Sequence, residues 1–405
     1  MSEALKGLKE QYLRCVRCGQ CRSVCPVFEV VRNETATPRG KVFLAHLLAT
    51  GELEATSQVQ AQLSRCLLCR SCSKECPSAI PVHQIVTAAR AELAEKTPSP
   101  TKRLVFKKIW ARPRRLALAA RLTRTIQALG LDRLGLSLRM LPPGFALPGR
   151  LPRRPAHTTI PAINPAIGET RLRVGYFLGC STNFMFPGVA ASTVAVLSRL
   201  GCEVVIPPEL KCCGLPQLAS GEAAAASALA SANSEVFRLL KVQTVVSDCA
   251  SCTVALKETP EFAGIKVTEL SELLLELVTK YSPGFRQIQK PVTYHYPCHL
   301  SKAQGITEAP RDLLLLTCRD FREMDSATDC CGSGGTFALY HYQTSMAILD
   351  KKIAAIKKSG AEIVATSCPT CIMQLRHGLA RHGYKIDVVH SVELLEKSFE
   401  HETLL

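Results

Sequence analysis

Residues 15–26 read CVRCGQCRSVCP, with four cysteines at spacings of three, three and four and a proline directly after the last one. The same arrangement returns at residues 66–77 as CLLCRSCSKECP. A compact inorganic cluster needs several thiolate ligands from one short loop, and this spacing supplies them. The paired runs therefore predict two iron–sulfur clusters held close together.

The two runs also predict which cysteines share a cluster. In bacterial ferredoxins the fourth cysteine of each such run ligates the other cluster. Applied here, this crossing gives the first [4Fe-4S] cluster the ligands Cys15, Cys18, Cys21 and Cys76. The second [4Fe-4S] cluster then has the ligands Cys66, Cys69, Cys72 and Cys25. A zinc site is the alternative, but structural zinc commonly uses separated pairs, whereas each run here offers four cysteines at once.

The segment between the two runs has helical spacing of its apolar residues and few turn formers over residues 38–66. With the two cysteine runs, it resembles the all-helical ferredoxin module found in respiratory dehydrogenases.

The composition is that of a globular protein with an unusual number of thiols. The chain has 405 residues, of which 47% are hydrophobic, 21% are charged and 20 are cysteines. The N-terminal stretch has neither a basic region nor a continuous apolar segment, and no long run of uncharged apolar residues occurs. We expect a cytoplasmic protein in which reduced thiols serve metal or redox chemistry rather than disulfides.

Ten of the remaining cysteines form a second repeat. The first set is Cys180, Cys212, Cys213, Cys249 and Cys252. The second set is Cys298, Cys330, Cys331, Cys368 and Cys371. Corresponding members are 118 or 119 residues apart, and so steady a period indicates a duplicated domain.

Short apolar segments alternate with helical segments throughout this duplicated part. In the first copy we expect strands at 172–180, 202–208 and 244–252 and helices at 186–201 and 221–240. This alternation predicts parallel α/β layers. Sites in such sheets gather at the carboxyl ends of strands, and a helix N-terminus favours thiolate, so the CxxC pairs are expected there.

Each set of five cysteines predicts a metal centre at one edge of its sheet. An iron–sulfur cluster, a zinc ion and free redox thiols are all compatible with the spacing, although five cysteines are one more than zinc needs. Gly214 and Gly332 follow the two CC pairs and are expected to let the backbone pass close to a bulky ligand. The leftover thiols, Cys202 and Cys318, are predicted to pack in the core.

Nearly all the excess positive charge lies between the two cysteine-rich parts. Residues 97–173 hold sixteen Lys or Arg against two acidic residues, a net +14 of the chain's +16. The pattern predicts amphipathic helices followed by an extended linker at 144–168. A solvated surface, an anionic membrane surface and an acidic partner subunit are the open interpretations. Nucleic acid is not expected, since no nucleic-acid module accompanies the charge.

The sequence offers no catalytic residue. No GxGxxG follows a predicted strand, no Walker sequence occurs, and CCGSGGTF at 330–337 is better explained as a turn beside the cysteine pair. Among the ten histidines, His299 lies beside Cys298 and is interpreted mainly as a structural hydrogen-bonder, with a proton donor as the alternative.

Over essentially its whole length the chain resembles the iron–sulfur subunit family of glycolate oxidase. The resemblance rests on both cysteine runs, TPRGK at 37–41, RCLLCRSCSKECPSAIPVHQI at 65–85, the basic connector and the two CCG domains. It implies an electron-transfer subunit that receives electrons from an FAD-containing subunit oxidising a 2-hydroxy acid, glycolate or D-lactate, and passes them toward quinone or another acceptor. A peripheral contact with the inner face of the cytoplasmic membrane fits this role.

A second resemblance keeps an enzymatic alternative open. The same domain order occurs in the anaerobic glycerol-3-phosphate dehydrogenase iron–sulfur subunit and in heterodisulfide reductase, whose CCG sets bind noncubane 4Fe-4S clusters that cleave a disulfide. The glycolate oxidase branch often has thinned sets, whereas both sets of five are complete here. The complete sets favour one or two further iron–sulfur clusters in the CCG domains, for which a noncubane 4Fe-4S centre is one candidate form. The alternatives to an electron-transfer subunit are a heterodisulfide-reductase-like catalytic subunit and a scaffold whose CCG domains hold a single metal.

Together these features predict an α+β multidomain protein. We expect an α-helical ferredoxin domain at 1–96, a basic connector and linker at 97–169, a first CCG domain at 170–285 and a second CCG domain at 286–405.

Overall fold

The N-terminal part of the chain is built only of helices. The computed structural model describes residues 3–138 and 149–399. The helices of the N-terminal part are α1 (Glu3–Lys6), α2 (Lys9–Leu13), α3 (Gln20–Ser23), α4 (Pro26–Val31), α5 (Pro38–Thr50), α6 (Ser57–Ser64), α7 (Ser71–Lys74) and α8 (Val82–Lys96). The longest two, α5 and α8, pack against each other around a core that contains Leu48, Leu63 and Ile85. The helical segment predicted between the cysteine runs is thereby confirmed.

The connector continues as helices. They are α9 (Pro100–Arg103), a π-helix at Leu104–Trp110, α10 (Pro113–Ala128) and α11 (Leu131–Ser137). Phe106 of the π-helix is buried, whereas one face of α10 leaves Leu118, Leu122 and Ile126 exposed. The amphipathic prediction is confirmed, but the apolar face of α10 looks outward rather than into a core.

A five-stranded sheet forms the first α/β unit. Its strands are β1 (Ile163–Asn164), β2 (Leu172–Tyr176), β3 (Cys202–Val205), β4 (Thr244–Ser247) and β5 (Val267–Glu269), in the order β1-β3-β2-β4-β5. All neighbours are parallel except β1, which pairs antiparallel with β3. The predicted linker thus ends as an edge strand of this sheet, because Ile163 pairs with Val205.

Helices connect and cover these strands. They are α12 (Cys180–Met185), α13 (Pro187–Arg199), α14 (Leu215–Ala219), α15 (Ala223–Leu239), α16 (Ala250–Glu258) and α17 (Leu270–Tyr281). Every strand and helix predicted for the first copy is present, with strands a few residues shorter than expected. Two of the strands end before the cysteines, which lie in loops and helix starts, and β3 ends before Pro207 and Pro208.

The second α/β unit has a smaller parallel sheet. Its strands are β6 (Val292–Tyr294), β7 (Ile363–Thr366) and β8 (Asp387–His390), in that order. Its helices are α18 (Cys298–Ser301), α19 (Glu308–Thr317), α20 (Phe337–Tyr340), α21 (Tyr342–Ser359), α22 (Pro369–Arg381) and α23 (Ser391–Ser398). The counterpart of β3 is reduced to isolated bridges such as Val292 with Phe321.

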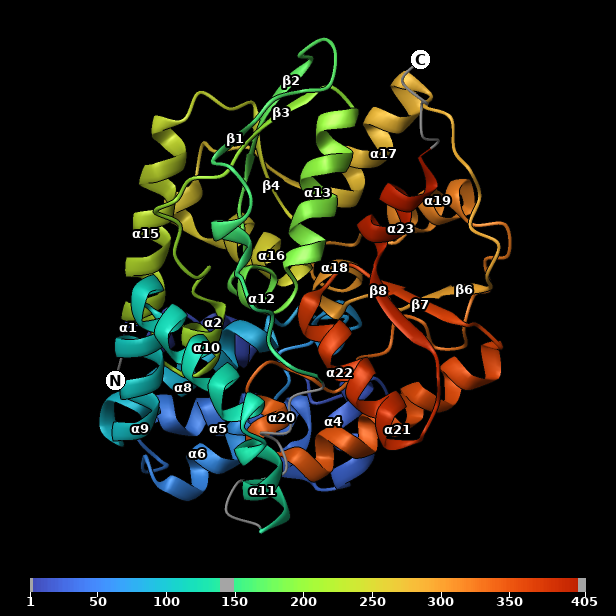
Figure 1. Ribbon diagram of the computed structural model, residues 1–405. Helices are drawn as coiled ribbons and strands as arrows, with labels where there is room; N and C mark the ends of the chain where they lie inside the picture. The colour runs from blue at the N-terminus through green and yellow to red at the C-terminus, as the bar shows by residue number, and fades with distance from the viewer. Residues whose placement is uncertain (1–2, 139–148, 400–405) are drawn as a thin grey trace.

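The three parts pack side by side. Figure 1 shows the blue N-terminal helices at one end of the molecule, below the two sheets. The α/β units meet through α13 against α23 and α17 against α19. The two contacts are equivalent, because α19 is the counterpart of α13 in the repeat and α23 is the counterpart of α17. The helical part contacts the second unit through α4 against α21. In the described residues, no helix combines the length and the apolar character needed to cross a membrane.

Candidate functional site

Both cysteine runs fold into the same loop. In the first run Arg17 and Gly19 have positive φ values of 56° and 88°, and in the second run Leu68 and Arg70 have 56° and 65° at the corresponding positions. Left-handed backbone is uncommon for residues other than glycine and is found mainly where a site requires it. The two left-handed residues therefore give the two loops the same curled backbone.

Four cysteines from both runs surround one pocket. Its lining includes the thiol-bearing residues Cys25, Cys66, Cys69 and Cys72 together with Lys41. Cys25 comes from the first run and directly precedes α4, where its sulfur accepts a hydrogen bond from the Phe28 amide at 3.4 Å. Four thiols around one interior, with no disulfide among the twenty free cysteines, match the donors that a [4Fe-4S] cluster takes.

Burial and mutual repulsion make these thiols poor thiolates without a cation. Burial raises the pKa of Cys69 to about 12, and the nearby Cys298 and Cys25 sulfurs add to the rise. Burial also raises the pKa of Cys72 and of Cys25, and the Lys41 ammonium partly offsets the rise at Cys25. Since a metal ligand must be the thiolate, the arrangement suits a positively charged iron centre.

The TPRGK segment explains how that lysine arrives. Thr37 caps α5, its hydroxyl accepting from the Gly40 amide at 2.9 Å, and Pro38 occupies the first helical position. Gly40 lies against the backbone carbonyl of Glu34, where a Cβ would collide. Lys41 is 1% exposed, donates to the Ala36 carbonyl and lines the pocket. The motif therefore places one buried positive charge beside the second ferredoxin loop.

The cysteines expected at the first cluster lie nearer the surface. Cys18 is exposed, whereas Cys15, Cys21 and Cys76 are half-buried. The Cys21 thiol interacts with Cys15 and Cys18, although burial is the largest cause of its raised pKa. Cys76 packs with Cys15 against the core of the helical part. The first loop is thus the edge of the site that faces outward.

The first set of five is gathered at the carboxyl ends of β2 and β4. Cys180 begins α12, Cys249 caps α16, and Cys252 follows one turn later. Hydrogen bonds from Cys212 and Cys252 hold the pKa of Cys213 well below its usual range. A hydrogen bond from Cys212 likewise lowers the pKa of Cys180. The pKa of Cys212, Cys249 and Cys252 is instead raised, by hydrogen bonds with neighbouring thiols at Cys212 and Cys252 and by burial. The five sulfurs therefore lie in contact with one another in one buried place.

The second set has the same layout. Cys298 begins α18 and Cys368 caps α22. Hydrogen bonds from Cys330 and Cys371 lower the pKa of Cys331 well below its usual range. The sulfur atoms of Cys331 and Cys371 are 3.7 Å apart. The expectation that both CxxC pairs lie at a strand end and a helix start is confirmed.

The two sets touch each other. Cys249 and Cys368, corresponding members of the repeat, are joined by a side-chain hydrogen bond that lowers the pKa of Cys368 well below its usual range. Nearby, the Ser251 hydroxyl lies 3.8 Å from the Cys368 sulfur. The ten thiols therefore form one continuous group across the interface between the α/β units.

The second set also meets the second ferredoxin loop. His299 follows Cys298; its Nε2 donates to the Leu68 carbonyl at 3.3 Å, and its Nδ1 lies 2.8 Å from the Ser251 hydroxyl. Burial is the main cause of the lowered pKa of His299, so the ring is neutral. His299 is the structural hydrogen-bonder that was expected, and it joins all three parts of the chain.

Two buried or half-buried arginines fasten the helical part to the first α/β unit. Arg90 donates to the carbonyls of Leu63, Ser64 and Cys66 and, across the junction, to that of Ala219 at 2.8 Å. Arg70 pairs with Glu258 through both of its terminal nitrogens. These bonds hold the cysteine loops in a defined position relative to the two sets.

The glycines after the CC pairs turn the backbone beside the cysteine sulfurs, and the Gly332 amide donates to the Cys330 sulfur at 3.4 Å. Gly214 and Gly332 have φ values of 87° and 82°, and an added Cβ would lie 3.1 Å from the Ala226 carbonyl and 2.7 Å from the Ser345 carbonyl. They are needed for a left-handed turn packed against helices α15 and α21.

The two leftover cysteines are core residues, as predicted. Cys202 is fully buried and Cys318 is 3% exposed, and burial raises the pKa of both, that of Cys202 to about 12.

Sequence reasoning missed two side chains at these sites. Lys41 belongs to the TPRGK motif, but nothing in the sequence assigns it to a cluster. Its burial beside the cysteine pocket reveals that position. His295 was one of ten scattered histidines; its signal was its place three residues before Cys298 in the repeat.

Two protein families match the chain. The family described as "4Fe-4S dicluster domain" matches residues 11–80. The family described as "Cysteine-rich domain" matches twice, at residues 174–257 and 292–376. Iron–sulfur clusters are thus cofactors of this chain, and the duplication inferred from the cysteine period is confirmed.

Curated relatives match over nearly the whole chain. "Probable glycolate oxidase iron-sulfur subunit" of Bacillus subtilis (strain 168) is 32% identical over 97% of this chain and 95% of its own length. Glycolate oxidase iron-sulfur subunit of Escherichia coli (strain K12) is 27% identical over 96% of this chain and 94% of its own. Lactate utilization protein A of Exiguobacterium sp. is 29% identical over 55% of this chain and 97% of its own.

Proposed function

Because the chain belongs to the family of glycolate oxidase iron–sulfur subunits, we propose that it carries electrons within a flavin-dependent 2-hydroxy acid dehydrogenase complex. Its partner would be an FAD-containing subunit that oxidises glycolate or D-lactate, and its acceptor a quinone or another oxidant. The observation that carries the proposal is the unbroken series of neighbouring cysteines from the first ferredoxin loop to the first cysteine-rich set.

The ligand sets follow from that series. We assign the first cluster to Cys15, Cys18, Cys21 and Cys76 and the second to Cys66, Cys69, Cys72 and Cys25. The pocket shared by Cys25 and the second run supports the crossing between runs. The two cysteine-rich sets would hold further iron centres, and the domain bounds 1–96, 97–169, 170–285 and 286–405 are kept as part of the proposal.

Iron–sulfur clusters supply single-electron acceptance and release when they are bound. The protein's own contribution is to hold the cysteine sites in a fixed spatial sequence and to exclude water from them. Cys69 is near both Cys25 and Cys298, so the second loop lies between the first loop and the second set. Cys368 and Cys249 then join the second set to the first. Buried side chains around these sulfurs keep solvent out and hold each site in place.

The first ferredoxin loop is the end at which a flavoprotein would dock. Its Cys18 is exposed, and the neighbouring Leu13 and Val16 are 56% and 71% exposed. Exposed apolar side chains beside a redox centre suit a protein interface, because their burial would bring the donor close without trapping polar groups.

The connector is the part suited to a membrane surface. On α10 the exposed Leu118, Leu122 and Ile126 recur at every fourth residue, and exposed arginines such as Arg114 and Arg121 flank them. An amphipathic basic helix of this kind binds anionic bilayers by burying its apolar side at the headgroups. Such a contact would bring the chain to a membrane quinone.

The test is anaerobic isolation of the protein from its native cell. We expect a companion flavoprotein, acid-labile sulfide and more than about eight iron atoms per chain, the number for two [4Fe-4S] clusters. Addition of glycolate or D-lactate should reduce the iron–sulfur absorption only when the flavoprotein is present. Iron-free protein, or reduction by the hydroxy acid without any flavin, would contradict the proposal.

A disulfide reductase is the second candidate, favoured by two complete sets that meet at Cys249 and Cys368. It predicts that the chemically reduced protein cleaves a small disulfide with one thiol pair formed per two electrons. If no thiol forms while electron transfer to quinone is intact, the disulfide reductase is excluded and the electron-transfer subunit remains.

A further inference from the structure

His295 is a buried imidazole without an ordinary partner. It follows β6 and is 0% exposed, and among the described residues neither ring nitrogen has an oxygen or nitrogen partner within hydrogen-bonding distance. A buried polar group left unpaired costs about 1–3 kcal/mol, so such groups in proteins commonly serve a site.

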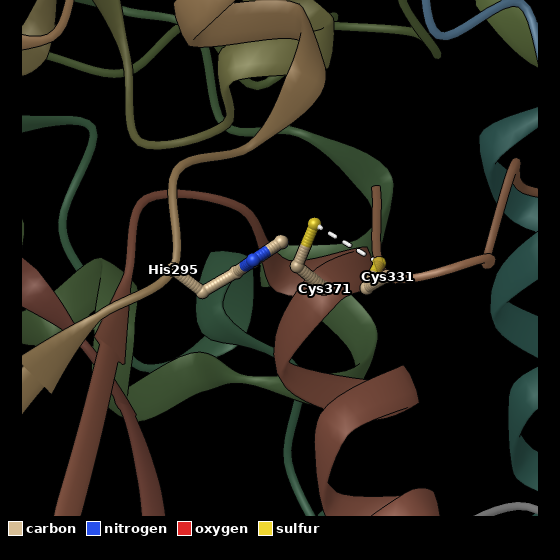
Figure 2. Close-up of side chains that lie close together, drawn as sticks. All are labelled: His295, Cys331 and Cys371. Carbon is tan, nitrogen blue, oxygen red and sulfur yellow. Dashed lines mark hydrogen bonds between the residues drawn. The ribbon is translucent and has the colours of Figure 1, made fainter. Parts of the chain in front are cut away.

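The ring points at two cysteines of the second set. Figure 2 shows His295 directed toward the sulfurs of Cys371 and Cys331. A ring nitrogen and these two sulfur atoms all lie within 4.8 Å of one another. All three residues are buried, and they come from three different segments: the end of β6, the CC pair and α22.

The spacing of the sulfurs fits shared coordination. Two thiolates at about 2.3 Å from one tetrahedral metal are about 3.8 Å apart, taking the metal–sulfur length known for zinc thiolates as a guide. The Cys331 and Cys371 sulfurs are 3.7 Å apart. A neutral imidazole can add one lone pair to such a metal through either ring nitrogen.

The first half of the repeat has no such group. The residue that corresponds to His295 is Phe177, and the backbone confirms the correspondence: the Phe177 amide donates to Val246 at 2.8 Å and the His295 amide donates to Ala365 at 2.9 Å. Phe177 packs against Phe237 in the core. The two sets of five cysteines thus differ in one buried donor.

His299, the other histidine near the second set, is already engaged. Its two nitrogens contact the Leu68 carbonyl and the Ser251 hydroxyl. His299 therefore has no lone pair left for a metal. Of the two histidines, His295 is the one that can offer a nitrogen donor to the second set.

We propose that His295 is a nitrogen ligand of the iron centre in the second cysteine-rich set, so that the two sets hold chemically different centres. The inference rests on the proposal that this set binds iron. The added imidazole gives the second set a ligand that the first set lacks, so the reduction potentials of the two centres should differ.

The test uses pulsed electron paramagnetic resonance on the anaerobically isolated complex, with the second-set signal identified by its loss in Cys331→Ser. Wild-type protein should show a strong coupling to one nitrogen-14. Protein grown with nitrogen-15 histidine should show the nitrogen-15 coupling instead, a measurement that needs no variant. His295→Phe, which copies the first half of the repeat, should remove the coupling, whereas the matched control His299→Gln should retain it.

A second-set signal without nitrogen coupling, or a coupling that survives His295→Phe, would overturn the inference. If the second set gives no signal in either redox state, iron-57 Mössbauer spectra replace the resonance experiment, because all iron contributes to them. His295→Phe must then change the iron component that Cys331→Ser removes, and unchanged spectra refute the ligation. An iron content of about eight atoms per chain would instead show that the proposed cluster in this set is wrong.

Discussion

The Cys249 and Cys368 thiols interact across the interface between the α/β units, and the two residues are the N-cap residues of corresponding helices of the repeats. Each of these two cysteines therefore belongs to its own set and contacts the other set. The duplicated domains face each other through their cysteines rather than through opposite surfaces, so two sites 118 or 119 residues apart in sequence become neighbours.

Removing one ligand of the second ferredoxin loop should interrupt electron flow without affecting substrate oxidation. Cys69→Ser is expected to lose about four iron atoms per chain, because Cys69 lies in the cysteine-lined pocket beside Cys298. In the assembled complex, hydroxy acid should still reduce a flavin-accepting dye, but not quinone. Cys202→Ala, at a buried thiol outside both sets, is the control and should keep its iron. Loss of dye reduction in Cys69→Ser would contradict the division of labour.

Replacing Cys330 and Cys331 with serine should empty the second set alone. Both residues share hydrogen bonds with the other sulfurs of the set. We expect the loss of a resonance signal distinct from those of the ferredoxin clusters and a fall in iron toward, but not below, about eight atoms per chain. An iron content equal to that of the wild type would mean that this set never held a cluster.

The exposed face of α10 should govern binding to anionic vesicles. Replacing Arg114, Arg115 and Arg121 with glutamine removes three exposed charges, each contributing about 1 kcal/mol near headgroups. Binding should weaken by roughly a hundredfold in vesicle co-sedimentation. The matched control replaces three exposed linker arginines, Arg150, Arg153 and Arg154. Equal binding by both triple variants and the wild type would assign the connector charge to a partner protein.

Arg90 should stabilise the junction between the helical part and the first α/β unit. Its guanidinium donates hydrogen bonds to four backbone carbonyls. In Arg90→Met these carbonyls lose their donor, and a buried acceptor without a donor destabilises the fold. The variant is therefore expected to lower the free energy of unfolding by about 2–4 kcal/mol. Thermal or denaturant unfolding of the anaerobic protein measures this. Arg121→Met, at an exposed arginine, should change stability by less than about 0.5 kcal/mol. Similar values for the two variants would refute the structural role.

His341 should make stability depend on pH below neutrality. Burial, with the positive charges of Arg65, Arg90 and Lys102 nearby, lowers the pKa of His341 to about 4, whereas an unfolded histidine titrates near 6.5. Between those values the unfolded chain binds more protons, so stability falls as the pH is lowered from about 6.5 toward 4.

The check on this prediction is the melting temperature at several pH values. His341→Gln can retain a contact with the Ser64 hydroxyl, which lies 2.8 Å from Nε2 in the wild type, and its melting temperature should decline less steeply with acid. Parallel pH profiles for wild type and variant would show that His341 makes no such contribution.

Much of the site was readable from spacing. Thiolate ligands for one centre must come from loops of fixed length, so the runs at 15–26 and 66–77 and the period of 118 or 119 residues were visible before folding. Strands and helices of the duplicated part followed from alternation, and the buried Cys202 and Cys318 from their apolar neighbours. The contact of Gly214 with the backbone of helix α15 is one that no local pattern reveals.

The sequence by itself determined the chemistry of this protein: which residues are soft sulfur donors, how many there are at each place and that the arrangement is duplicated. Only the tertiary structure decided their order in space, with Cys69 beside Cys298, Cys368 beside Cys249 and His295 turned toward Cys371. The reason is physical. Ligand spacing within a loop is a local property of the backbone, whereas contact between loops depends on how helices and sheets far apart in the chain bury their apolar faces against each other.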